Sequence, residues 1–159
     1  MSPAELAALR KQLGIKPAAD RSAPWSADES THQRNLLAWC SHARATMPEL
    51  AWLYASANGG LRTAATAGRL KGEGVKAGVF DLSLDCARRG FHGLRIELKV
   101  PAVPGVKGVR KAKPAGSPSV EQLAWQKNYL AEGYQAVICY GWLEARDVLI
   151  NYLTKDSPT

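Results

Sequence analysis

The run LRIELKV at residues 94–100 constrains the fold of this chain more than any other stretch. Side chains alternate between the two faces of a β-strand, so Arg95, Glu97 and Lys99 are expected to share one face. The apolar residues between them face the other way and need a core to cover them. The run therefore predicts a strand that is buried on one face and carries a carboxylate and an ammonium group on the other.

The preceding run GVFDLSL, at residues 78–84, shows the same alternation. Asp81 and Ser83 are expected on one face, and the positions expected to face the core are Phe80, Leu82 and Leu84. The Arg-Arg-Gly sequence at residues 88–90 has the composition of a tight turn, so the two strands are predicted to pair as a hairpin. Such a hairpin would bring Asp81 and Glu97 to one point.

Helix and strand signals alternate along the rest of the chain. Helices are predicted at residues 28–45, 63–70, 119–132 and 143–153, and further strands at residues 50–57 and 135–140. This order favours an α/β fold in which a mixed sheet is flanked by helices. Residues 1–27 are predicted to form a short helix and a linker, and residues 28–155 to form the folded domain.

The charge composition favours a polyanionic partner. The 159 residues include 21 Lys and Arg against 14 Asp and Glu, a net charge of +7, which favours nucleic acid or an anionic membrane surface. No stretch approaches the roughly 20 apolar residues of a membrane-spanning helix, and the first residues lack the apolar segment of a secretory signal. We therefore expect a cytoplasmic protein that binds nucleic acid and no membrane.

Residues 101–118 form the most basic segment. Four prolines and three glycines predict a mobile loop there. The segment has no acidic residue, and its cations are Lys107, Arg110, Lys111 and Lys113. Positive charge on a loop one element from Glu97 could clamp a nucleic-acid backbone, which gives salt dependence without sequence choice.

Asp81 and Glu97 are the candidates for chemistry, because two converging carboxylates repel each other unless a proton or a cation lies between them. Mg²⁺ is the natural cation, since it prefers oxygen ligands and keeps several waters, and Mn²⁺ accepts the same oxygens. Such an ion can activate water and neutralise charge on a phosphodiester, while Lys99 orients that water or stabilises the developing charge. Taken alone, however, Glu-x-Lys is more typical of a surface ion pair on a half-solvated sheet.

Four stretches supply the missing context, in this order: ASANGGLR, AGRLKGEGVKAGVFDLSL, GFHGLRIELKV and SVEQLAWQKNYLAEGYQAVICYGWLEARDVLINYL. Together they resemble the VRR-NUC branch of the PD-(D/E)xK nuclease superfamily, especially its stand-alone forms from phages and bacteria. The resemblance covers about four fifths of the chain, from about residue 29 to residue 153. It implies a restriction-endonuclease-like core of helix, three strands, helix and strand (αβββαβ), in agreement with the order predicted above.

The resemblance also implies roles for individual residues. Asp81 stands at the family's metal-binding aspartate, and Glu97 with Lys99 stands at its Glu-x-Lys motif. The backbone carbonyl of Leu98 is expected as a further metal ligand. One departure is that Phe80 stands where the family commonly has proline, and phenylalanine does not fix the backbone φ as proline does.

Two helical residues have two interpretations each. The resemblance places Gln122 at the site, whereas its spacing from Ser119 equally predicts an S-x-x-Q capping box. Glu29 stands where the family often has a glutamate metal ligand, but an acid in the first turn is also favoured by the helix dipole. The histidines show no partner spacing and are expected at the surface or in loops: His32, His42 and His92.

Several other residues lie near the predicted site. The turn at residues 58–60 is placed beside the site by the resemblance, and Asp85 is expected to be a solvated acid near the hairpin turn. Four cations either contact phosphates or simply keep the surface soluble: Arg62, Arg69, Lys71 and Lys76.

We expect a Mg²⁺- or Mn²⁺-dependent endonuclease that hydrolyses phosphodiester bonds in DNA. The resemblance implies a homodimer, selectivity for branched or four-way-junction DNA, and a place in the cytoplasm of a bacterial or phage-infected cell. Two rivals belong to other classes. One is a nucleic-acid-binding module that kept the fold and lost turnover, and the other is a structural protein whose basic surface packs against nucleic acid.

Overall fold

A four-stranded sheet forms the centre of the computed structural model, which describes residues 28–56 and 64–154. The strands lie in the order β1-β2-β3-β4, which are Leu53–Ala55, Leu82–Leu84, Leu94–Lys99 and Gln135–Tyr140. β1 pairs with β2 and β2 with β3 in antiparallel fashion, whereas β3 and β4 are parallel. The sheet is therefore mixed, as predicted, because the chain must cross over between β3 and β4.

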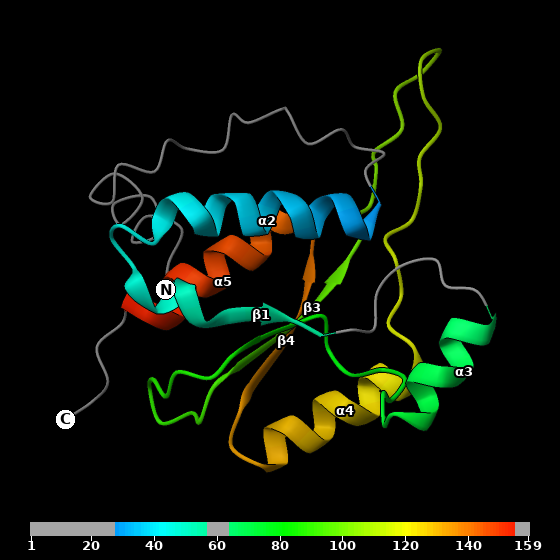
Figure 1. The fold of residues 1–159 in the computed structure, drawn as a ribbon. Coiled ribbons are helices and arrows are strands. Elements are labelled where there is room, and N and C mark those ends of the chain that lie inside the picture. The colour runs from blue at the N-terminus through cyan, green and yellow to red at the C-terminus, as the bar shows by residue number, and fades with distance from the viewer. Residues whose placement is uncertain (1–27, 57–63, 155–159) are drawn as a thin grey trace.

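Helices cover both faces of this sheet (Figure 1). Helix α2 (Glu29–Ala43) packs on α5 (Trp142–Thr154) over one face, and α4 (Val120–Ala131) lies against the other, with the short α3 (Ala64–Gly72) near its end. The α/β class and the order of elements are as the sequence predicts. Across residues 28–56 and 64–154, no helix combines the length and the apolar composition that a membrane span requires.

The main core lies between the sheet and the α2–α5 pair. Alternate residues of β2 and β3 face it, as the period of two predicts, and they are at most 1% exposed: Leu82, Leu84, Leu94, Ile96 and Leu98. Each such side chain stabilises the fold by roughly 1.5–3 kcal/mol through burial. Tight packing on this face fixes the other face of β3, which carries Glu97 and Lys99.

Phe80 does not follow the predicted alternation. It is fully buried, but it packs edge-on against Tyr129 of α4, with ring centroids 5.5 Å apart, and lies outside the core cluster beneath α2 and α5. The alternation fails because β2 begins only at Leu82: Gly78 has a φ of 80° and the chain bends at Asp81. Asp81 therefore lies at the entrance of the strand and not within it.

The predicted strand at residues 50–57 is wrong in its first half. Residues Pro48–Trp52 form a 3-10 helix, and only Leu53–Ala55 pair with β2. Pro48 occupies the first position of the helix, where its fixed φ favours a helical turn. Leu50, at 3% exposure, packs into the core from this helical turn and not from a strand.

The basic segment at residues 101–118 is a narrow two-stranded ribbon and not a simple loop. Val103 pairs with Lys113 and Val106 with Arg110, and the chain turns at Gly108, whose φ is 74°. Figure 1 shows the ribbon leaving the end of β3 and extending away from the body of the molecule. We call residues 101–118 the arm.

Some predictions fall outside the described residues. They are the helix and linker at residues 1–27, the turn at residues 58–60, Arg62 and the end of the domain at residue 155.

Candidate active site

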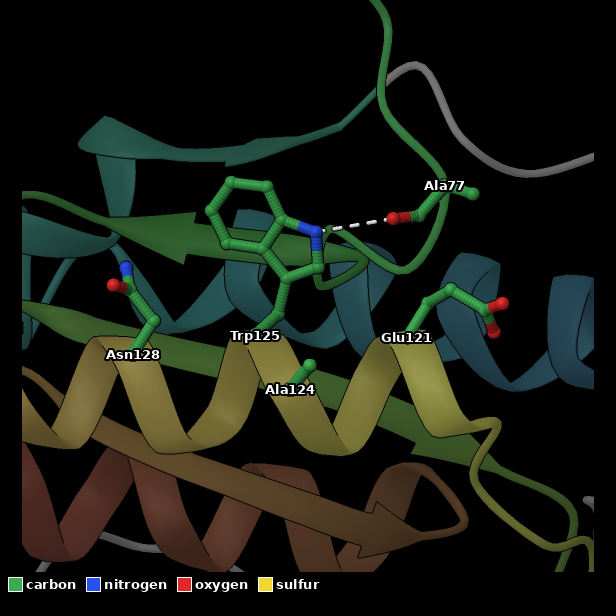
Figure 2. A pocket seen from close by; sticks show the side chains of 5 residues that line it. All are labelled: Ala77, Glu121, Ala124, Trp125 and Asn128. Carbon is green, nitrogen blue, oxygen red and sulfur yellow. Dashed lines mark hydrogen bonds between the residues drawn. The ribbon is translucent and has the colours of Figure 1, made fainter.

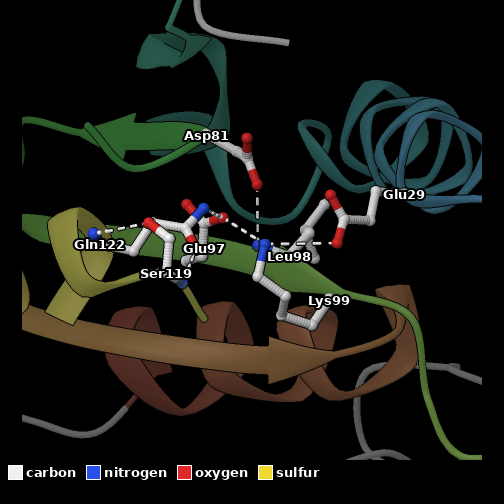
Figure 3. Close-up of polar contacts among 7 residues, drawn as sticks. All are labelled: Glu29, Asp81, Glu97, Leu98, Lys99, Ser119 and Gln122. Atoms are coloured by element: carbon white, nitrogen blue, oxygen red, sulfur yellow. Dashed lines mark hydrogen bonds and ion pairs between the residues drawn. The ribbon is translucent and has the colours of Figure 1, made fainter. Parts of the chain in front are cut away.

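The hairpin of β2 and β3 brings Asp81 and Glu97 to one region. Leu82 pairs with Ile96, so the same register continued by one residue sets Asp81 opposite Glu97. Asp81 Oδ2 accepts a hydrogen bond of 2.9 Å from the backbone nitrogen of Leu98. Figure 3 shows these two carboxylates, the ammonium group of Lys99 and the carboxylate of Glu29 turned toward one another.

Glu97 is the most buried of these groups, with 1% of its surface exposed. Its Oε1 accepts hydrogen bonds from Lys99 Nζ, at 2.7 Å, and from Gln122 Nε2. Its Oε2 is buried and has no hydrogen-bond donor within the part of the chain that the structure describes. Burial, together with the charge of Asp81, raises the pKa of Glu97 to about 7, although the hydrogen bond from Lys99 lowers it.

Lys99 is also buried, at 5% exposure, and its Nζ lies 2.7 Å from Glu97 Oε1 and 3.2 Å from Glu29 Oε1. Burial alone lowers the pKa of Lys99, but the hydrogen bond to Glu97 and the two carboxylate charges outweigh it, so the net shift is upward. The side chain is therefore an ammonium group at neutral pH. The interpretation of Glu-x-Lys as a surface ion pair is wrong, because the Glu97–Lys99 pair is buried.

Asp81 is half-buried at the edge of this cluster. Burial raises its pKa by more than the hydrogen bond from Leu98 and the charge of Lys99 lower it. The N–H and the carbonyl of a strand residue leave on the same side of the strand. The Leu98 carbonyl therefore leaves β3 on the side of Asp81.

Gln122 caps α4 and also contacts Glu97. Ser119 Oγ accepts a hydrogen bond from Gln122 N at 3.2 Å, and Gln122 Oε1 accepts one from Ser119 N at 2.8 Å, which completes a capping box for α4. The amide nitrogen of the same side chain donates to Glu97 Oε1. The start of α4 is thereby tied directly to the buried carboxylate.

Glu29 also combines two roles. Asp28 caps α2 by accepting a hydrogen bond of 2.7 Å from Thr31 N, and Glu29 follows as the acid in the first turn. Its side chain is 47% exposed and reaches Lys99. The structure therefore brings Glu29 to the site as an ion-pair partner of the lysine.

The loop that leads into Asp81 is fixed on α4 (Figure 2). Trp125 Nε1 donates a hydrogen bond of 3.0 Å to the carbonyl of Ala77, and both residues line a small pocket with Glu121. The next residue, Gly78, lies so close to α4 that a Cβ there would approach Glu121 Cβ to 2.5 Å. Only glycine combines this approach with a positive φ at no steric cost.

Phe80 supplies the last anchor before Asp81. The VRR-NUC resemblance has proline at this position, and proline fixes the approach through its φ. Here the buried ring of Phe80 against Tyr129 holds the chain by packing. In the sequence, the only sign of this contact is an aromatic residue next to an aspartate. That pattern alone does not predict that the ring packs against another helix.

Arg95 shares the site face of β3, and the sequence predicted no partner for it. Its guanidinium lies 2.8 Å from Asp85 and stacks 4.3 Å from the ring centroid of Tyr134. Asp85 also accepts a hydrogen bond of 3.0 Å from the hydroxyl of Tyr54. Asp85 is therefore half exposed, but it is paired with Arg95 and Tyr54 and is not simply solvated. Its carboxylate compensates the charge of Arg95.

His32 contradicts the prediction of a surface position. It is 5% exposed, and its Nδ1 accepts a hydrogen bond of 3.3 Å from Trp142 N, which joins α2 to α5. Burial lowers its pKa. His42 and His92 are exposed as predicted, and the four-residue spacing of His32, Leu36 and Cys40 was the available signal for a buried helix face.

The predicted phosphate-binding cations lie outside this cluster. Arg69 forms an exposed ion pair of 2.8 Å with Glu73 on α3, and Lys71 and Lys76 are exposed nearby. On the arm, Arg110 is half-buried with its Nε donating to the Pro104 carbonyl at 3.1 Å. The three lysines of the arm are exposed: Lys107, Lys111 and Lys113.

The donor set of the cluster fits a hard divalent cation. Within residues 28–56 and 64–154, no group of three His, Cys, Asp or Glu side chains could hold a metal ion by itself. Mg²⁺ commonly needs only one or two carboxylates and keeps several waters. Asp81, Glu97 and the Leu98 carbonyl meet that requirement, and the unpartnered Glu97 Oε2 is an oxygen that such an ion would satisfy.

Comparison with known proteins identifies the fold. No family model matches the sequence, and no curated protein matches it either. The structure is similar to a solved structure described as a VRR_NUC domain protein, with a TM-score of 0.63 and 26% sequence identity. The similarity covers 83% of this chain and 93% of that one. It confirms the resemblance predicted from the sequence: this chain has the fold of the VRR-NUC domains, a nuclease-family fold.

Proposed function

We propose that this chain is a divalent-metal-dependent endonuclease that hydrolyses phosphodiester bonds in DNA. The likeness to a VRR_NUC domain protein supports a nuclease. The observation that carries the proposal is the state of Glu97, whose Oε1 has two donors while its buried Oε2 has none among the described residues. A structural ion pair would have no reason to leave one buried carboxylate oxygen unsatisfied beside a second carboxylate.

Asp81, Glu97 Oε2 and the Leu98 carbonyl would hold Mg²⁺ or Mn²⁺. A bound ion of this kind supplies an acidified water and neutralises charge on the phosphate. Glu97 must be deprotonated to bind the ion. Because burial raises its pKa to about 7, the carboxyl is partly protonated at neutral pH before the ion binds. Lys99 and Gln122 hold Oε1, which leaves Oε2 available to the ion.

Lys99 acts in this proposal as a cation and not as a base. Its raised pKa keeps it protonated, so it cannot accept a proton from water. It can donate hydrogen bonds to the attacking oxygen and stabilise the negative charge that grows on the phosphate. Glu29, whose carboxylate binds the same Nζ, orients the lysine.

DNA is proposed as the substrate on charge and on the fold. A net charge of +7 favours polyanions, and phosphate contacts by the arm and by α3 would position the duplex. A homodimer and a preference for branched DNA belong to the same proposal as implications of the VRR-NUC resemblance.

The test compares the wild-type protein with Asp81→Asn on labelled linear, flapped and four-way DNA, with Mg²⁺ and with a chelator. Asparagine keeps an oxygen that can accept the hydrogen bond from Leu98 N, so the fold is expected to survive. Asp85→Asn is the matched control, since that carboxylate lies on the same hairpin but pairs with Arg95. We expect metal-dependent cleavage by wild type and control and none by Asp81→Asn.

Two results would contradict the proposal. Equal cleavage by wild type and Asp81→Asn would show that the activity comes from elsewhere. Salt-sensitive DNA binding by a folded wild type, with no cleavage in Mg²⁺ or Mn²⁺, would favour the rival module that binds nucleic acid without turnover.

A further inference from the structure

The tip of the arm exposes apolar side chains where a turn would normally be polar. Val109 is 82% exposed and Val106 is 46% exposed, on either side of the turn at Gly108. Tight turns usually carry Asn, Asp or Ser because these side chains bond to their own backbone. The fold leaves Val109 almost fully in water and Val106 partly so, at the end of a protruding ribbon where a partner can cover both.

The charges around the tip define the partner. Lys107 and Lys111 are exposed near the valines, and Arg110 lies between Val109 and Lys111 in the sequence. The whole arm has no acidic residue. This combination complements a surface that offers phosphates outside and an apolar interior. Stacked base pairs provide both, because an apolar side chain can enter between two bases while lysines contact the flanking phosphates.

The arm is a direct continuation of the site strand. Lys99 ends β3, and Val106 follows it by seven residues in the same chain direction. Seven extended residues span at most about 25 Å. At about 3.4 Å per base pair, the tip can therefore reach about seven base pairs from a phosphate held at Glu97 and Lys99.

We propose that Val106 and Val109 form an apolar wedge that inserts into a base step of bound DNA, within about seven base pairs of the phosphate held at the site. This proposal rests on the proposed nuclease function and adds to it a determinant of substrate choice. Insertion unstacks a base step, and it is easiest where stacking is already broken, at flexible steps, nicks, flaps and junctions. The wedge thus selects distorted over regular duplex.

An anionic membrane offers similar chemistry, since lipid headgroups and tails also combine phosphates with an apolar layer. The continuity of the arm with β3 favours DNA, because the tip is then aligned with the strand that carries Glu97 and Lys99. Vesicle binding is kept as an outcome of the test.

The experiment places 2-aminopurine at successive positions of a duplex, counted from the cleavage site of the wild type. Binding is measured without divalent metal, so that the DNA stays intact. We expect a rise in fluorescence at one or two steps within about seven base pairs, which reports unstacking. The variant V106S/V109S should lose this rise and bind a flapped duplex roughly tenfold more weakly, because two valines no longer enter the stack.

Three controls separate the wedge from charge and from general surface effects. V106L/V109L keeps an apolar tip and should restore the fluorescence rise. K107Q/K111Q should weaken binding to all DNA and reduce its salt dependence, yet keep the rise at saturating protein. V120S removes a valine that is 80% exposed on α4, outside the arm, and should behave as wild type.

A short duplex distinguishes this proposal from the proposed function. Its end lies between the cleavage site and the step at which the fluorescence rises, so the tip has no base step to enter on that side. Cleavage of it by V106S/V109S at the wild-type rate, with the loss described above, supports the wedge. An unchanged fluorescence rise and unchanged flap binding in V106S/V109S would overturn the wedge while the nuclease function stands. If V106S/V109S lost binding to phosphatidylglycerol vesicles but kept its DNA binding and the fluorescence rise, the wedge would also be overturned. Absence of cleavage by the wild type would overturn the nuclease function.

Discussion

The site and the arm both carry charge, but they handle it in opposite ways. At the site, Lys99 is buried and lies against two carboxylates, and burial raises the pKa of Glu97 to about 7. On the arm, three lysines are exposed in a segment with no acidic residue. Chemistry needs groups whose properties burial has changed, whereas phosphate recognition needs solvated cations that exchange counterions with DNA. One continuous stretch of chain, from β3 into the arm, carries both kinds of charge.

Glu97→Gln should have the largest effect of these changes. It should abolish most cleavage activity and leave DNA binding by the arm unchanged. Removal of one ligand charge at a metal centre costs several kcal/mol of transition-state stabilisation, which is roughly a thousandfold or more in kcat. DNA affinity should stay equal or rise slightly, since a negative charge is lost. Single-turnover cleavage and metal-free binding assays would measure the two quantities separately, and a parallel loss in both would contradict the separation of site and arm.

Glu97 at the site should also make stability fall as the pH rises. The pKa of Glu97 is about 7 in the folded chain against 4.5 when unperturbed, so the folded state holds the proton more tightly. The resulting stability is present below about pH 4.5 and is lost as the pH rises through 7, by about 3 kcal/mol at most. Thermal denaturation without metal would show this fall, Glu97→Gln should flatten it, and Mg²⁺ should restore stability near pH 8.

Gln122 and Ser119 allow the cap of α4 to be separated from the support of Glu97. Gln122→Ala removes both contacts and should lower kcat or metal affinity by roughly 10–100-fold, as loss of a partner of a metal ligand does. Ser119→Ala removes only the cap and should cost about 1 kcal/mol of stability with most activity kept. Mn²⁺ titration of both variants is the measurement, and equal metal affinities would assign Gln122 to the cap alone.

The arm should give the smallest effect on catalysis. Lys107→Gln combined with Lys111→Gln should reduce the slope of log affinity against log salt by about 1.8, since each phosphate contact contributes about 0.9. At saturating DNA, kcat should stay as in the wild type. The arm would lose its assignment as a phosphate clamp if the salt slope stayed the same.

Local periodicity predicted the parts of the molecule that depend on neighbours in sequence. The alternation in LRIELKV placed Glu97 and Lys99 on one face, and the spacing of Ser119 and Gln122 predicted the cap. The failures depend on tertiary contacts. His32 is buried because α5 packs on α2, and Phe80 packs on Tyr129 of α4 because the chain bends before β2 begins.

The sequence predicted the positions of the site residues but not their burial or their pKa values. The sequence placed Glu97 and Lys99 side by side, but their burial comes from α2 and α4, which arrive from residues far away in the chain. The shift in the pKa of Glu97 follows from that burial. Side-chain chemistry alone therefore could not tell a buried pair from a surface one.

Gly78 has a consequence for how this chain can vary by mutation. Any other residue there would have to adopt a φ of 80° and also displace the backbone of α4 at Glu121. Such a change would shift Asp81 and Gln122 together, since one follows the glycine and the other lies on the displaced turn. A homologue that keeps every acid, lysine and amide of the site but replaces this glycine should therefore be inactive, and its loss would be invisible to a scan of charged residues.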